Sequence, residues 1–208
     1  MVRLGGGALV AGTALFLAGM ITSPAADSHS LGDYITSLAR DSVLTQTSAL
    51  LLHYGNLLIG TGALVLPFLV RGARGRIVTI VGALLVTLGF LNTSGAVLSD
   101  WWNMEVGRQL PLDRAVSVAQ AVLDAPGLMA WKGLQDIGLI GVVIVLAGLA
   151  RAGVVRWWLV PVPLVFMAAA FAVPLSLPLL VSAVIALALA PLAAVGVLTV
   201  RRAGLAAA

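Results

Sequence analysis

AWKGLQDIGLIGVVIVLAGLAR, residues 130–151, decides how this chain can fold. The stretch has the length and the apolar content of a helix that crosses a membrane, and Asp136 is the one carboxylate within it. A charge inside the hydrocarbon layer is costly, so such residues usually face a protein interior or a cavity and indicate a functional site. We therefore expect the chemistry of the protein to be arranged around Asp136.

The composition extends this interpretation to the whole chain. Of the 208 residues, 61% are hydrophobic and only 10% are charged, and the mean hydropathy is +1.10, which is unlike a soluble domain. The net charge of +4 does not indicate a nucleic-acid partner, because the arginines flank apolar segments instead of forming a long basic run. The sequence has no cysteine, which excludes disulfides, iron–sulfur clusters and cysteine zinc sites. We expect no metal and no cofactor.

Six apolar segments predict an all-α, polytopic membrane protein whose six transmembrane helices form a single bundle over residues 1–208. The expected spans cover roughly residues 4–22, 49–70, 77–98, 131–150, 157–173 and 179–200. Residues 1–26 also have the layout of a cleavable signal peptide. We interpret them as the first span, because the apolar run from Leu4 to Ile21 is long for a signal core.

Two polar segments, residues 27–48 and 99–130, separate these spans on one side of the membrane. In each segment the apolar residues recur at helical spacing, which predicts two short amphipathic helices that lie along the outer surface and cover the mouth of the bundle. In the second segment we expect Asp113 to be the N-cap and Ala125-Pro126-Gly127 to end the helix.

The basic residues predict the orientation. Eight of the 12 lysines and arginines fall on the side of the chain termini, and four fall on the side that carries the polar segments. By the positive-inside rule both termini are cytoplasmic, and the protein is a multi-pass protein of the inner (plasma) membrane. The short cytoplasmic connections contain no phosphate loop and no dinucleotide-binding motif, so we expect no nucleotide as a partner.

Polar residues on three expected spans lie at one depth. With a rise of ~1.5 Å per residue, Asn56, Asn92 and Asp136 lie about 22–24 Å above the cytoplasmic arginines, in the outer third of a layer ~30 Å thick. Their convergence predicts an outward-facing ligand site. Its expected residues are His53, Asn56, Asn92, Asp100, Trp101, Trp102, Lys132, Gln135 and Asp136. If the site is catalytic, Asp136 and Glu105 are the candidate acids.

Each of these residues also has a purely structural interpretation. Asn56 and Asn92 are of a type that joins helices by hydrogen bonds, and Asp136 has Lys132 at i−4 as an ion-pair partner. His53 fits a partnered histidine at the interface. Trp101 and Trp102 fit interfacial anchors.

Three segments carry a resemblance to a known group: HYGNLLIGTGALVLPFLVRGARGR (residues 53–76), LDRAVSVAQAVLDAPGL (residues 112–128) and IVLAGLARAGVVRWW (residues 144–158). Together they resemble a loose group of small six-helix integral membrane proteins of actinobacteria, over roughly residues 50–160. The resemblance implies the architecture and carries over no catalytic residue.

Three functions remain open. The first is binding or translocation of a small amphiphile or lipid in the outward-facing site. The second is an integral membrane enzyme that acts on a lipid or isoprenoid, similar to terpenoid cyclases and initiated by acid from Asp136 or Glu105. The third is an accessory subunit of a larger membrane complex, or a homo-oligomer, that packs through the fifth and sixth helices.

Overall fold

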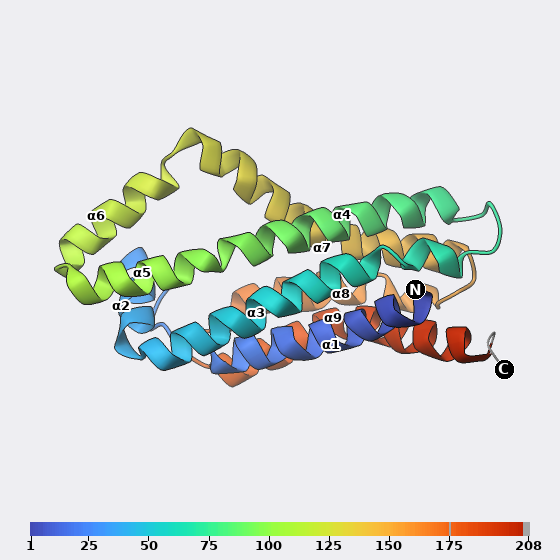
Figure 1. Ribbon diagram of the computed structural model, residues 1–208, viewed down its shortest axis with the longest axis horizontal. Helices are drawn as coiled ribbons and strands as arrows, with labels where there is room; N and C mark the ends of the chain where they lie inside the picture. Colours follow the sequence, from blue (N-terminus) through green and yellow to red (C-terminus); the bar gives the residue numbers. More distant parts are fainter. Residues whose placement is uncertain (175, 206–208) are drawn as a thin grey trace.

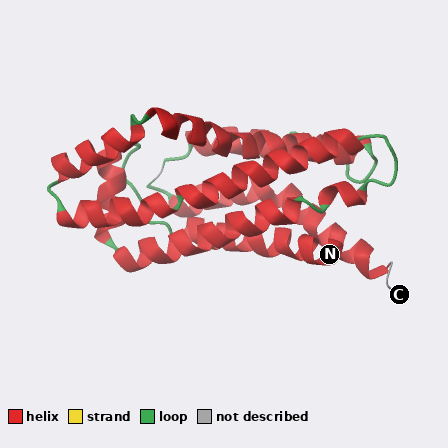
Figure 2. Ribbon diagram, turned by 45° about the horizontal axis from the view of Figure 1, so that its top comes forward, coloured by secondary structure: helices red, strands yellow, loops and turns green. Residues whose placement is uncertain are grey.

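The computed structural model describes residues 1–174 and 176–205. The molecule is 83% helix, without strands in the described part of the chain, which confirms the all-α prediction (Figure 2). By length and composition, four helical segments among the described residues are able to cross a membrane. They are α1 (Val2–Thr22), the continuous segment of α4 (Arg76–Ala96) and α5 (Leu98–Gln109), α7 (Pro126–Arg151) and most of α9 (Pro178–Leu205).

The second expected span, residues 49–70, is not one helix. α3 (Ser42–Ala63) begins earlier than predicted, because the Asp41 side chain caps it by accepting a hydrogen bond from the Leu44 N–H (2.9 Å). It ends at Ala63, and the short 3₁₀ helix η1 (Leu66–Leu69) follows. Pro67 in that segment has no N–H to donate to the Ala63 carbonyl, so the α-helix cannot continue through it.

The fifth expected span, residues 157–173, is also divided. The 3₁₀ helix η2 (Trp157–Leu159) comes first, and α8 (Val162–Ala172) follows after Pro161. Proline fits the first turn of a helix and not its interior, so Pro161 and Pro163 place the start of α8 at Val162. The 11 residues of α8 make a helix of only ~16 Å, about half the thickness of the hydrocarbon layer.

The predicted outer helices are α2 (Leu31–Arg40) and α6 (Leu112–Leu123). They pack on one another and on α5 through a small core of Ile35, Ala115 and Ala119. They do not lie flat over the bundle, because α5 continues the line of α4 beyond it and α6 folds back from the far end of α5 (Figure 1). The three helices form a projecting outer layer.

The ends of α6 correct two details of the prediction. The residue before the helix is Pro111, whose side chain makes no capping hydrogen bond, and Asp113 lies in the first turn, where its charge still suits the helix dipole. Pro126 begins α7 instead of terminating α6. Proline is favoured at the first position of a helix, where the missing N–H has no partner to lose.

Close helix pairs build the bundle. α4 packs along α7, and α1 packs along α3 and α9. In the α4–α7 pair the backbones meet at Gly89, where an added Cβ would come within 2.2 Å of Gly138. Only glycine permits this approach. α7 makes far fewer contacts with α8 and α9, so the space between these elements is less completely filled.

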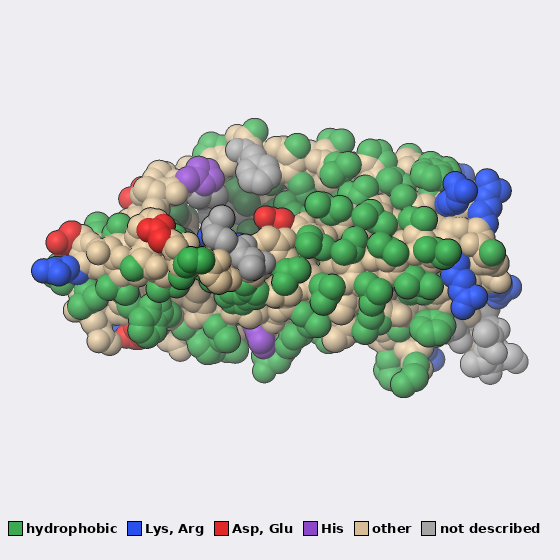
Figure 3. Space-filling model, turned by 90° about the horizontal axis from the view of Figure 1, so that it is seen from above, with side chains coloured by type: hydrophobic (Ala, Val, Ile, Leu, Met, Phe, Trp, Pro, Cys, Tyr) green, Lys and Arg blue, Asp and Glu red, His purple; other side chains and the backbone are tan. Residues whose placement is uncertain are grey.

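Charge distinguishes the two ends of the molecule. Both termini lie at one end in Figure 1. Most of the visible lysine and arginine side chains gather at that end in Figure 3, with others toward the opposite end, where most of the visible acidic side chains lie. We call these the basic end, with Arg3, Arg71, Arg74, Arg76, Arg151, Arg156, Arg201 and Arg202, and the acidic end, formed by α2, α5 and α6.

Candidate functional site

An inner cavity of about 240 Å³ lies between the helix pairs and is lined by three of the predicted site residues, which come from two different helices. Asn56 of α3 and Asp136 of α7 both line it, together with Thr93 and Gln135. The rest of its lining is apolar and comes from α1, α4, α7, α8 and α9: Phe16, Phe90, Leu139, Met167, Ile185 and Leu189.

Asn56 is the most deeply buried polar residue of this cavity. Its side chain is only 1% exposed, and its Nδ2 donates to the Leu52 carbonyl at 2.7 Å. Since Nδ2 must be the donor in that bond, Oδ1 is the free acceptor, and it has no hydrogen-bond partner among the described residues. An unpaired buried acceptor lowers the stability of the fold by about 1–3 kcal/mol. A ligand whose hydrogen-bond donor reached Asn56 Oδ1 would therefore bind favourably.

Asp136 lies on the cavity wall and is also exposed, so the cavity is open beside it. Because α7 is continuous from Asp136 to Arg151, the carboxylate lies ~22 Å from the basic end of that helix. Lys132 is exposed, and in the described part of the chain neither residue forms an ion pair or a hydrogen bond. The structural ion pair considered above is therefore not formed.

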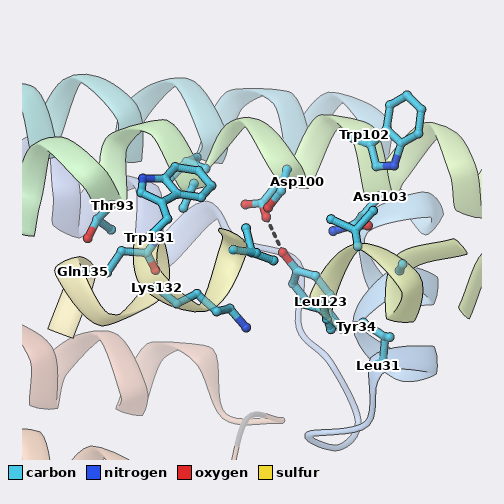
Figure 4. A pocket seen from close by; sticks show the side chains of 16 residues that line it. Leu31, Tyr34, Thr93, Asp100, Trp102, Asn103, Leu123, Trp131, Lys132 and Gln135 are labelled. Carbon is cyan, nitrogen blue, oxygen red and sulfur yellow. Dashed lines mark hydrogen bonds between the residues drawn. The ribbon is translucent and has the colours of Figure 1, made fainter. Parts of the chain in front are cut away.

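A larger outer cavity of about 480 Å³ lies beneath the projecting layer. Figure 4 shows its labelled side chains, with the Tyr34 hydroxyl donating to the Asp100 carboxylate across α2 and α5. Burial, followed by the negative charge of Asp100, raises the pKa of Tyr34 above its ordinary value. Tyr34 therefore remains protonated at physiological pH and keeps donating to Asp100.

The two cavities adjoin. Thr93 of α4 and Gln135 of α7 line both of them, and Lys132, Trp131 and Trp102 line the outer one. The combined space changes from mixed polar and aromatic walls at the acidic end to mostly apolar walls inside the bundle. The acceptors Asn56 and Asp136 lie on the inner side of this transition.

Two predicted site residues make contacts elsewhere. The His53 ring nitrogen Nδ1 lies 2.8 Å from Ser94 Oγ and 3.2 Å from the Ser94 carbonyl oxygen, so His53 joins α3 to α4. Asn92 uses its Nδ2 to donate to the Leu88 carbonyl of its own helix at 2.7 Å. Neither residue lines the two cavities, so Thr93 takes the position on α4 that Asn92 was expected to hold.

The remaining candidates lie on α5. Glu105 accepts from Arg108 (3.3 Å) and from Gln109 (3.2 Å) on the same helix, and it lines neither cavity. Trp102 is 59% exposed, and its indole points away from Tyr34 in Figure 4. Trp101 is half-buried, and its Nε1 has no partner among the described residues.

Tyr34 and Thr93 line these cavities although neither was predicted from the sequence. Tyr34 lies one position before Ile35 on the apolar side of α2. The hydroxyl of a tyrosine on a buried face typically finds a hydrogen-bond partner, and this was the signal in the sequence that could have indicated Tyr34. Thr93 follows Asn92 directly. Adjacent residues of a helix point in directions about 100° apart, so the rotation of α4 about its own axis decides whether Asn92 or Thr93 faces the cavity. The depth of a residue in the membrane does not determine that rotation.

Comparisons with protein-family models, curated proteins and solved structures found no match for this chain. The resemblance to the actinobacterial group stays a prediction.

Proposed function

We propose that the protein binds or translocates a small amphiphile or lipid in the two adjoining cavities. In this proposal it is a multi-pass protein of the plasma membrane with six crossing segments and cytoplasmic termini. The second crossing segment is α3 with η1, which runs beside α1 and α4. The fifth is η2 with α8. The acidic end then faces outward, and the outer cavity opens on that side.

The observation that carries the proposal is the inner cavity itself. Its wall is mostly apolar, yet it contains a buried amide and a carboxylate, those of Asn56 and Asp136. Neither the Asn56 Oδ1 nor the Asp136 carboxylate has a partner among the described residues. Carboxylates within a membrane are expensive unless they pair or face a cavity. Both groups offer acceptors, so the ligand they favour carries hydrogen-bond donors, such as hydroxyl or ammonium groups, on an apolar body.

A cavity-filling substitution tests this proposal. Met167→Trp on α8 places a larger ring in the inner cavity, whereas Leu164→Trp on the same helix adds the same ring on a side chain that is 56% exposed and does not line it. Mass spectrometry of lipids that co-purify in mild detergent should show an amphiphile in the wild type and in Leu164→Trp. Met167→Trp should retain much less of it. Equal retention by the two variants would contradict the proposal.

The enzyme alternative gains less support from the geometry. The two acids predicted from the sequence do not share a cavity, because Asp136 lines the inner one and Glu105 lines neither. Glu105 is engaged with Arg108 and Gln109 on α5. Asp100 is a carboxylate of the outer cavity, where it accepts from Tyr34. The same purification distinguishes the subunit alternative, because a stable protein partner would appear in place of a lipid.

A further inference from the structure

A third cavity, of about 580 Å³, lies at the basic end, away from the two cavities discussed above. Three segments that are distant in sequence form it: the turn after η1, the turn after α7 and the end of α9. Its lining residues are Leu69, Val70, Arg71, Gly72, Arg74, Ala152, Gly153, Val154 and Arg202. The fold thus brings together arginines from two separate parts of the chain.

No described residue compensates the charge in this cavity. Arg71, Arg74 and Arg202 are all exposed, and none of them forms an ion pair with a described residue. Among the described residues, the lining contains no acidic side chain. Guanidinium groups have several N–H donors in a planar fork that matches the oxygens of a phosphate, so the cavity is suited to a phosphate-bearing anion.

The backbone of the turn adds further donors. The N–H groups of Arg71, Gly72 and Arg74, which line the cavity, donate to no other described residue, and α4 begins shortly afterwards at Arg76. Unpaired N–H groups beside the positive end of a helix dipole favour anions. Gly75 holds the turn at φ 81, and a Cβ there would lie 2.3 Å from the Gly148 carbonyl oxygen. The turn is therefore fixed against α7.

The apolar residues of the lining indicate the source of the phosphate. Leu69, Val70 and Val154 form part of the wall beside the arginines, so the cavity lies where the apolar surface of the bundle gives way to charge. We infer that this arginine pocket binds the phosphate group of an anionic lipid, with the acyl chains against the neighbouring apolar helices. Basic pockets between membrane helices bind lipid headgroups in this way. Free phosphate would make the same contacts with the arginines, but it has no apolar part that could pack against the apolar wall.

The test compares two triple variants that remove the same charge from the same end. Arg71→Gln/Arg74→Gln/Arg202→Gln alters the pocket, and Arg3→Gln/Arg151→Gln/Arg156→Gln alters exposed arginines outside it. Full-length protein is released from mixed micelles of phosphatidylglycerol and phosphatidylcholine, and native mass spectrometry measures the lipid retained. The wild type and the control triple should retain phosphatidylglycerol selectively, and the pocket triple should retain it about tenfold less, a difference of 1.4 kcal/mol.

Competition with inorganic phosphate distinguishes the two sources. Retention of phosphatidylglycerol that excess phosphate does not displace supports the lipid, whereas displacement at low phosphate would overturn the lipid assignment and leave a simple anion site. Equal losses in the two triple variants would show general surface electrostatics and overturn the pocket, as would a wild type without preference for phosphatidylglycerol. If the pocket triple fails to fold, the pair Arg74→Gln and Arg156→Gln gives the same comparison with one charge.

Discussion

At the scale of single residues, Asn56 explains most about the proposed site. A buried amide that joins two helices uses both its donor and its acceptor. Within the described part of the chain, Asn56 donates only inside its own helix, and its Oδ1 has no partner. An unpaired buried acceptor lowers stability and persists where another interaction compensates for it. A ligand donor in the inner cavity would supply that interaction.

Asn56→Leu tests this account of the residue. The substitution removes an unpaired acceptor at a buried position, so the thermal stability of the ligand-free protein in detergent should stay constant or rise by about 1 kcal/mol. Binding of the amphiphile should weaken. Asn92→Leu is the matched control, because in the described part of the chain Asn92 also bonds only within its own helix and does not line the cavity. A large loss of stability in Asn56→Leu with binding unchanged would mean that Asn56 is structural.

At the scale of helices, the α4–α7 pair positions the site. Thr93 and Gln135, which line both cavities, come from these two helices, and the contact between Gly89 and Gly138 fixes how the helices are rotated against each other. The cavity exists because α7 packs closely on α4 and sparsely on α8 and α9. The pair is therefore the rigid wall of the site.

Gly89→Ala should disturb this wall. An added Cβ would lie 2.2 Å from the Gly138 backbone, so the helices must separate, with a loss of about 1–3 kcal/mol typical of overpacking. Gly133→Ala on α7 meets nothing within 4 Å and should be neutral or stabilising by up to ~1 kcal/mol, since alanine favours the helix. Thermal unfolding in detergent measures both. Equal stability of the two variants would contradict the close pairing.

The bounds of some helices could be predicted from the sequence, and those of others could not. Apolar length and helical spacing were sufficient for α1, α4, α7 and α9 and for the outer helices α2 and α6. They failed at the ends of α3 and α8, where hydropathy continues through Pro67 and Pro161 although the α-helix does not. Depth placed Asn56 and Asp136 at one level, but the choice of Thr93 over Asn92 depends on the packing rotation of α4, which hydropathy does not encode.

At the scale of the whole molecule, the distribution of charge and the arrangement of the helices distinguish the same two ends. Both termini and eight arginines occupy one end, and the helices α2, α5 and α6 project from the other (Figures 1 and 3). The outer cavity lies under that projecting layer, and the arginine pocket lies at the basic end. In the orientation proposed from the positive-inside rule, the two kinds of site lie in opposite leaflets.

Single-cysteine labelling tests this orientation without interference, because the chain has no cysteine. Ser117→Cys on the exposed face of α6 should react with a membrane-impermeant maleimide in intact cells, and Gly72→Cys should react only after lysis. Gly72 suits the substitution because a Cβ there meets nothing within 4 Å, whereas Gly75 needs a positive φ. Labelling of Gly72→Cys in intact cells would reverse the orientation.

Asp136→Asn tests the central claim most directly, with bound amphiphile and thermal stability measured on the same detergent-purified sample. Because Asp136 has no ion-pair partner among the described residues, the variant should fold with stability within about 1 kcal/mol of the wild type, and its retained amphiphile should fall about tenfold or more, equivalent to 1.4 kcal/mol of lost binding. The double variant Lys132→Met/Asp136→Leu should not restore binding. Marked destabilisation by Asp136→Asn that the double variant repairs would instead show a structural ion pair, and unchanged amphiphile content would contradict the site.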